Sequence, residues 1–124
     1  MPTIAIDFDG TITRYSGYKG KLVFDLPFGG AKKYINKLRK DGWTIIINTT
    51  RKEILDVEMY LRDWGIYYDF VNYNPQNQER DLSDKKVIAD VYLDDRNVEF
   101  DGDWGKAFEK IKKFKPWWKN GKKK

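Results

Sequence analysis

The sequence predicts a protein of the α/β class, built as one three-layer domain around a mainly parallel central sheet. Short apolar runs alternate along the chain with stretches whose apolar residues recur at the helical spacing. Three of the apolar runs end directly in polar residues, and the carboxyl ends of strands in an open parallel sheet are where ligands bind. A chain of 124 residues can bury one core but not two, so we expect a single domain.

In the N-terminal half we expect two strands, each followed by a helix. The apolar run at residues 4–6 predicts the first strand, and the aromatic, glycine-containing stretch 12–28 predicts a loop or small hairpin. Residues 31–38 carry apolar side chains at the helical spacing with lysines opposite, which predicts the first helix. Residues 44–47 predict the second strand and residues 53–64 the second helix, and a glycine follows each helical stretch as a stop signal.

The C-terminal half continues the alternation. Residues 68–71 predict a third strand, residues 74–78 a polar loop, and residues 91–93 a fourth strand. Residues 104–114 predict a final amphipathic helix. No internal repeat is visible.

The first strand runs into Asp7-Phe8-Asp9-Gly10-Thr11, where two carboxylates lie one residue apart. The strand period of two turns Asp7 and Asp9 toward the same side, and Gly10 allows a sharp turn close to a ligand. Two acids held this closely repel each other unless a metal or a proton intervenes, and the arrangement suits the hard cation Mg²⁺. Taken alone, the pentapeptide is also compatible with a solvated turn.

Two later strands end in similar chemistry. The second runs into Asn48-Thr49-Thr50-Arg51, and the fourth runs into Asp94-Asp95-Arg96-Asn97, with Lys86 shortly upstream. Because the ends of parallel strands converge at one edge of a sheet, these segments are expected to meet in space. Arg51 and Arg96 either contact substrate or pair with the acids, and both alternatives are open.

These segments, taken in order, resemble the haloacid dehalogenase superfamily of phosphohydrolases. That superfamily combines an aspartate pair written DxDGT, a Thr or Ser after a hydrophobic strand, a Lys, and a late acidic pair after another strand. The matching residues here are Asp7, Asp9 and Thr11; Thr49; Lys86, with Lys85 as the less favoured choice; and Asp94 with Asp95. The match spans most of the chain, and residues 89–105 look like those of the small capless members. The resemblance implies a Rossmann-like fold.

The resemblance also implies a phosphatase that forms an aspartyl-phosphate intermediate. Asp7 would be the nucleophile, and Asp9 would protonate the leaving oxygen and then activate water. Mg²⁺ would be bound by Asp7, the main-chain carbonyl of Asp9, Asp94 and Asp95. The phosphoryl oxygens would be held by the side chains of Thr49 and Lys86, with Thr50 beside them, and by the backbone of the turn at Phe8, Asp9 and Gly10.

Members of this superfamily often insert a specificity cap after the first motif or between the second and third. Here the first connection is too short for more than a flap, and the second already holds a predicted helix, strand and loop, so we expect no cap domain and an open site. The aromatic loop with Tyr15 and Tyr18 is the best candidate for a partial lid, although ordinary packing explains such aromatics equally well.

Composition excludes several competing chemistries. The chain contains no His and no Cys, which excludes histidine phosphoryl transfer, thiolate phosphatases, catalytic triads, disulfides and Cys/His zinc sites. No signal peptide or membrane-spanning run is visible, so we expect a soluble, cytoplasmic protein with no membrane partner.

The positive charge lies at the C-terminus. Residues 106–124 contain nine lysines and one glutamate, a net charge of +8, whereas residues 1–105 carry −3 of the total of +5. We therefore divide the chain into a catalytic domain, 1–114, and a basic tail, 115–124. Lysines mixed with Trp117 and Trp118 can contact phosphates and stack on bases, or the tryptophans can fold back on the core beside a solvated terminus.

Two functions from different classes follow. The favoured one is a Mg²⁺-dependent phosphatase acting on a phosphomonoester, small or macromolecular. The alternative is a nucleic-acid-binding or phosphate-binding protein on the same scaffold with little turnover. A signalling receiver domain is disfavoured because its acidic pair comes first, whereas here the first motif is DxDGT and the acidic pair is late.

Overall fold

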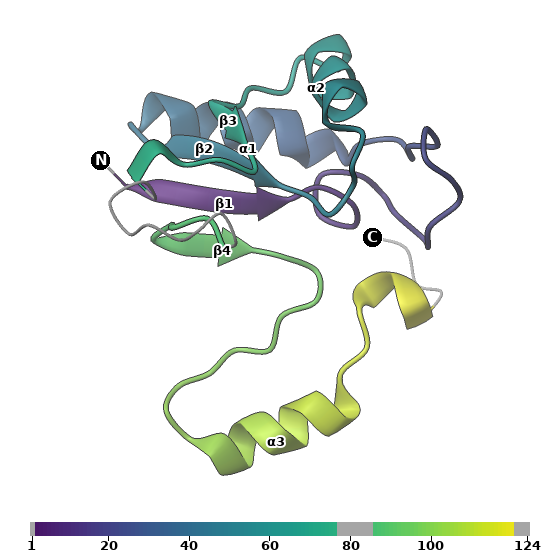
Figure 1. Ribbon diagram of the computed structural model, residues 1–124. Coiled ribbons are helices and arrows are strands. Elements are labelled where there is room, and N and C mark those ends of the chain that lie inside the picture. The colour runs from purple at the N-terminus through teal and green to yellow at the C-terminus, as the bar shows by residue number, and fades with distance from the viewer. Residues whose placement is uncertain (1, 77–85, 121–124) are drawn as a thin grey trace.

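The computed structural model describes residues 2–76 and 86–120. It confirms the predicted fold class: the protein is a small α/β, Rossmann-like domain with a parallel sheet (Figure 1). The elements, in chain order, are β1 (Thr3–Asp7), α1 (Gly29–Lys40), β2 (Thr44–Asn48), α2 (Ile54–Asp63), β3 (Phe70–Val71), β4 (Val91–Leu93), α3 (Trp104–Lys113) and the 3-10 helix η2 (Trp117–Asn120).

The sheet has the strand order β3-β2-β1-β4, and each neighbouring pair is parallel. Ile6 of β1 lies opposite Ile47 of β2 on one side and Leu93 of β4 on the other. Asp7 pairs with Asn48, and Asp94 follows the last β4 pair directly. The three predicted polar segments therefore leave the sheet at the same edge.

β3 is shorter than the predicted range 68–71, whereas β4 coincides with the predicted range 91–93, and an aspartate begins the pairing of each edge strand. Asp69 exchanges two hydrogen bonds with Ile45, its backbone N–H donating to the Ile45 carbonyl and its carboxylate accepting from the Ile45 N–H, both at 2.8 Å. Asp90 does the same with Thr3. In each pair, the aspartate side chain accepts the hydrogen bond that a backbone carbonyl accepts in a regular ladder. For this reason β3 begins at Phe70 and not at Tyr68.

The core lies between the two central strands and the first two helices. Alternation along β1 and β2 points four isoleucines to one face, where they pack with residues of α1 and α2. The fully buried members include Ile45, Ile47, Val57 and Leu61. Phe8, the residue between the two acids of the turn, is also fully buried and makes edge contacts with Phe24 and Tyr60. The turn that carries the acids is therefore anchored in the core.

The last helix differs from the others because it stands away from the sheet (Figure 1). Its start is set locally, since the Asp103 carboxylate accepts a hydrogen bond from the Lys106 N–H at 3.1 Å. Its apolar stripe is not buried: Trp104 is 76% exposed and Phe108 is 56% exposed. After α3 the chain turns back, and η2 lies near the loop that follows β1 (Figure 1).

No helix in the described part of the chain is both long enough and apolar enough to cross a membrane.

Candidate active site

Three carboxylates meet at the carboxyl edge of the sheet. Asp7 ends β1, Asp94 and Asp95 follow β4, and one oxygen from each lies within 4.8 Å of the others. The register explains the meeting, because β1 and β4 are hydrogen-bonded neighbours that end side by side. Three oxygen ligands at this separation can be bridged by a hard divalent cation such as Mg²⁺.

The protonation of Asp7 reflects this crowding. Burial, a hydrogen bond with Asp95 and the negative charges of Asp94 and Asp95 raise the pKa of the Asp7 carboxyl to about 8, against a small opposing effect of the Thr11 hydroxyl. Without a cation, the Asp7 carboxyl therefore keeps its proton at neutral pH. The donor set fits a divalent cation, because a double positive charge removes the repulsion that the proton otherwise relieves.

The turn after β1 is closed by its own backbone. The Phe8 carbonyl accepts hydrogen bonds from the N–H groups of Thr11, Ile12 and Thr13 at 3.4, 3.0 and 3.1 Å. Gly10 has a φ of +90°, and a Cβ atom there would lie 2.1 Å from Oδ2 of Asp95. Any other residue would be strained at this φ, and its Cβ would clash with the Asp95 carboxylate, so position 10 requires glycine. The glycine that the sequence predicts for a sharp turn is thus needed for the close approach of Asp95.

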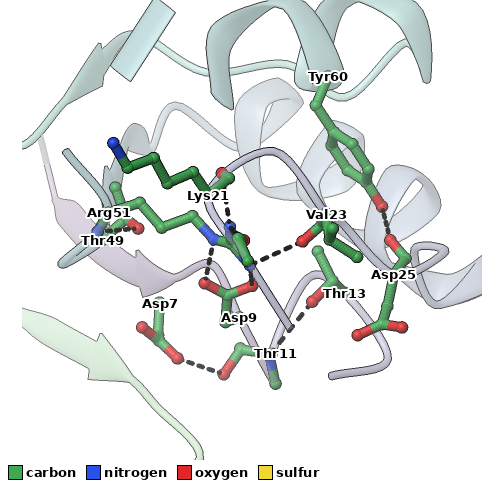
Figure 2. A network of polar contacts seen from close by, with 12 residues as sticks. Asp7, Asp9, Thr11, Thr13, Lys21, Val23, Asp25, Thr49, Arg51 and Tyr60 are labelled. Atoms are coloured by element: carbon green, nitrogen blue, oxygen red, sulfur yellow. Dashed lines mark hydrogen bonds and ion pairs between the residues drawn. The ribbon is translucent and has the colours of Figure 1, made fainter. Parts of the chain in front are cut away.

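Asp9 is not part of the triad, and its carboxylate points toward Arg51, which follows β2 (Figure 2). Both of its oxygens accept hydrogen bonds from Arg51, at 2.7 Å from Nε and 3.0 Å from a terminal nitrogen. Burial alone would lower the pKa of the Arg51 guanidinium, but the hydrogen bonds and charge of Asp9 raise it above its usual range. Of the two alternatives left open for Arg51, the structure shows the one in which it pairs with an acid.

Arg51 uses its remaining donors on the aromatic loop. The terminal nitrogens donate to the carbonyls of Gly20 at 3.3 Å, Lys21 at 3.2 Å and Val23 at 3.1 Å. With the two bonds to Asp9, all five guanidinium N–H groups have acceptors inside the protein. The guanidinium also lies over the Phe24 ring, 4.5 Å from its centre. Arg51 therefore joins β2, the turn at Asp9 and the loop 12–28 into one unit.

Thr49 occupies the end of β2 as predicted. Its hydroxyl accepts a hydrogen bond from the Arg51 N–H at 3.1 Å, and its backbone exchanges two hydrogen bonds with the Asn72 side chain. It is not the N-cap of α2, since that helix begins at Ile54 after Glu53. The hydroxyl proton of Thr49 can still be donated to a ligand.

The lysine of the predicted set lies elsewhere. Lys86 is exposed, and its Nζ lies 4.6 Å from the centre of the Tyr92 ring on β4. It is not among the residues that line the cavity described below. Lys85, the less favoured choice, lies outside the described residues.

One cavity of about 550 Å³ is lined by the predicted acids and by Thr49 and Thr50, but not by Thr11. Its cations are Lys21, Arg51, Lys52 and Arg96, and Tyr15 and Tyr18 border it from the aromatic loop. Tyr15 is buried, whereas Tyr18 is 63% exposed. The loop is thus a wall of the site, with one tyrosine packed and one facing solvent. The residues that line the cavity are Asp7, Asp9, Tyr15, Tyr18, Lys21, Thr49, Thr50, Arg51, Lys52, Glu53, Asp94, Asp95 and Arg96.

Two residues that the sequence did not place in the site contact it from the C-terminal segment. The indole N–H of Trp117 donates to the Gly10 carbonyl at 2.8 Å, and that of Trp118 donates to Oδ2 of Asp95 at 2.5 Å. The sequence leaves two alternatives for these tryptophans, a fold-back on the core and stacking on nucleic-acid bases, and the structure shows them folded back. Their composition gives no signal for the particular carbonyl and carboxylate that they reach.

Comparison with known proteins supports the fold. No protein-family profile matches the chain, and no curated protein matches it. A solved structure of a conserved protein from Bacteroides thetaiotaomicron is similar to it, with 28% sequence identity, a TM-score of 0.64 and coverage of 98% of both chains. The likeness extends over nearly the whole length of both proteins, so it supports the single-domain α/β fold.

Proposed function

We propose that this protein is a Mg²⁺-dependent phosphatase of the capless haloacid dehalogenase type, which hydrolyses a phosphomonoester through an aspartyl-phosphate. The observation that carries the proposal is the meeting of Asp7, Asp94 and Asp95 within 4.8 Å in a cavity that Asp9 and Thr49 also line. These residues come from three strand ends, and the order in the chain is that of the superfamily motifs.

In the first step, a carboxylate oxygen of Asp7 attacks phosphorus and the bond from phosphorus to the leaving oxygen breaks. Asp9 gives a proton to the leaving oxygen. In the second step, Asp9 takes a proton from water while the water oxygen attacks the same phosphorus, which releases phosphate and frees Asp7. The Thr49 hydroxyl and the Asp9 backbone N–H hold the phosphoryl oxygens in both steps. The other two amides expected to do so are used within the protein: the Phe8 N–H donates to the Asn48 carbonyl at 3.1 Å, and the Gly10 N–H donates to the Thr13 hydroxyl at 3.4 Å.

Asp7, Asp94 and Asp95 would hold Mg²⁺, and the ion would neutralise the charge of the phosphoryl group and of the triad. Two further cations of the cavity, Lys21 and Arg96, are exposed, so an anionic substrate can reach them. Arg51 is less available, because its donors are used within the protein.

The hydrogen bonds between Asp9 and Arg51 affect which leaving groups the protein can release readily. Both oxygens of Asp9 are engaged by Arg51, so proton transfer to a leaving oxygen requires that one of these hydrogen bonds be given up. An aryl phosphate, whose leaving oxygen needs little protonation, should therefore be hydrolysed faster than an alkyl phosphate.

The test is a phosphate-release assay on aryl, sugar and nucleotide phosphates with and without Mg²⁺, comparing wild type with Asp7→Asn. We expect Mg²⁺-dependent turnover in wild type and none in the variant, since the amide keeps the shape but cannot attack phosphorus. Circular dichroism verifies that the variant is folded. Turnover that survives in folded Asp7→Asn would exclude the covalent mechanism. Binding of phosphate esters without turnover in wild type would favour the phosphate-binding alternative.

A further inference from the structure

The C-terminal segment reaches the acid triad through one hydrogen bond whose surroundings are well defined. Oδ2 of Asp95 accepts the indole N–H of Trp118, and the same oxygen lies against the backbone of Gly10, where a Cβ would be 2.1 Å away. This carboxylate oxygen is therefore in contact with both the turn and the indole. Its remaining lone pairs can face a cation.

The Trp118 ring is itself fixed by residues of the site. Tyr15 meets it edge-on with ring centres 5.0 Å apart, and the Arg96 guanidinium lies 5.2 Å from its centre. One residue earlier, Trp117 donates to the Gly10 carbonyl and meets Phe28 with ring centres 5.4 Å apart. These contacts come from the loop after β1 and from the segment after β4, the two segments that flank the triad.

We propose that Trp118 is a positioning residue of the metal site: its indole N–H orients the Asp95 carboxylate for the cation that the triad binds. The inference rests on the proposed Mg²⁺ site but not on turnover. A hydrogen-bond donor to a metal-binding carboxylate fixes the direction of the ligand, and loss of such a partner typically weakens metal binding by about 10-fold or more. The catalytic unit then extends to residue 118 and is incomplete without the C-terminal segment.

The decisive variant is Trp118→Phe in the full chain. Phenylalanine keeps a ring against Tyr15 and Arg96 but removes the N–H. We expect the Kd for Mg²⁺, measured by calorimetric titration, to rise by about 10-fold, with the circular dichroism spectrum and melting temperature nearly unchanged. The matched control is Trp104→Phe, which removes an indole N–H from an exposed position on α3 and should leave the Kd as in wild type.

Trp117→Phe tests whether the C-terminal segment affects the metal site through the Trp118 hydrogen bond or only by packing. It removes an indole N–H that reaches a carbonyl and not a carboxylate. A Kd raised equally by Trp117→Phe and Trp118→Phe would overturn the proposal, because the segment would then act only by packing. A Kd that Trp118→Phe leaves unchanged or lowers would also overturn it; a lowered Kd would show that the indole competes with the cation for Asp95.

A measurement on wild type decides the matter if Trp118→Phe does not fold. In an NMR spectrum of protein labelled with ¹⁵N at tryptophan, the Trp118 indole resonance should shift during a Mg²⁺ titration while the Trp104 resonance stays in place. Indole resonances that do not respond to Mg²⁺ would overturn the proposal. Mg²⁺ binding that depends on Trp118 in a protein without phosphatase activity would uphold this inference and refute the proposed function.

Discussion

Asp7 has an unusual place among the acids of this protein, because it keeps a proton at a pH where most carboxyls are charged. The unfolded chain loses that proton near the ordinary pKa of 3.8, whereas the folded, metal-free protein loses it at a pKa of about 8. Between these values the folded state binds more protons than the unfolded state. The contribution of Asp7 to the free energy of unfolding therefore falls as the pH rises through this window.

We predict that metal-free wild type loses thermal stability relative to Asp7→Asn as the pH is raised from about 5 to about 9. The asparagine cannot ionise, so it removes this part of the pH dependence. Melting curves of both proteins over this range measure the difference, and saturating Mg²⁺ should abolish it by replacing the proton. Parallel stability profiles for the two metal-free proteins would contradict the raised pKa.

Arg51 provides the second prediction at the scale of single residues. Its side chain is 4% exposed, and removal of one partner from a buried ion pair typically costs about 3–5 kcal/mol. In urea denaturation, we expect Arg51→Met to lower the free energy of unfolding by about 2–4 kcal/mol. This loss is smaller than the typical one because the Asp9 side chain is partly exposed. Its neighbour Lys52, exposed on the same cavity, supplies the matched control Lys52→Met, which should cost less than about 0.5 kcal/mol.

The loop should respond as well. Because three loop carbonyls accept from Arg51, limited proteolysis within residues 16–25 should be faster in Arg51→Met than in wild type. Arg51→Lys keeps the charge but cannot present a planar fork to Asp9 and the loop together, so it should fall between the two. Equal stability and equal cleavage of the Arg51→Met and Lys52→Met proteins would show that Arg51 does not join the loop to the site.

The difference between Arg51 and Thr49 shows what sequence can and cannot predict about single residues. Thr49 lies where its position after a hydrophobic strand predicts, because a strand end fixes the location of its own side chains. The partner of Arg51 depends on which of several nearby acids the folded loop brings into reach. Spacing along the chain contains no information about that choice, so the sequence leaves both alternatives open.

At the scale of elements, local patterns predict the first two strands as short continuous apolar runs and the first two helices by apolar residues at the helical spacing. The predicted third strand is too long, since the apolar pattern does not reveal that the Asp69 side chain replaces a ladder acceptor. The last helix lies where its period predicts, and its cap explains why it forms. Of its apolar stripe Ala107 is buried, whereas Trp104, Phe108 and Ile111 are exposed. Helical periodicity predicts a helix, but what the helix packs against depends on the path of the residues before it.

The C-terminal segment can be divided by two truncations. Ending the chain after Asn120 removes Lys122, Lys123 and Lys124 but keeps both tryptophans. We predict that this protein keeps its Mg²⁺ affinity and its turnover of aryl phosphates, whereas a chain that ends after Phe114 loses Mg²⁺ affinity together with the hydrogen bonds of Trp117 and Trp118. Calorimetry and phosphate release measure both effects.

Oligonucleotide binding by the same two proteins tests the nucleic-acid alternative. If the terminal lysines bind phosphates, the shorter truncation should flatten the dependence of log K on log salt by about 0.7 for each phosphate of a single strand that is no longer neutralised. The tryptophans are engaged at Gly10 and Asp95, so the longer truncation should add little to this effect through base stacking. An unchanged salt slope in both proteins would assign the lysines to a solvated terminus.

At the scale of the whole molecule, the strand order places the site at the point where the chain changes direction across the sheet. The path from β1 through β2 to β3 proceeds outward on one side of β1, and β4 then lies on the other side. In open α/β sheets, this point is where ligands bind. That relation explains why three polar segments, far apart in the sequence, can be predicted to meet without knowledge of their individual partners.

The pairing of β1 with β4 also determines when the triad of Asp7, Asp94 and Asp95 assembles during folding. Thr3 and Asp90, which bond at the start of this pairing, are 87 residues apart, roughly twice the separation of Thr3 from its β2 partner Thr44. Closing the longer loop costs about 0.6 kcal/mol more, and β4 contributes only three residues, so we expect β4 to dock after the rate-limiting step.

A ligand that bridges Asp7 and Asp94 then acts only on the finished protein. In stopped-flow experiments, Mg²⁺ should slow unfolding in proportion to its occupancy and leave the refolding rate unchanged. Acceleration of refolding by Mg²⁺ would instead place the β1–β4 pairing in the transition state. The cation would then bind in the last step of folding and dissociate in the first step of unfolding, so it would give the native state kinetic stability.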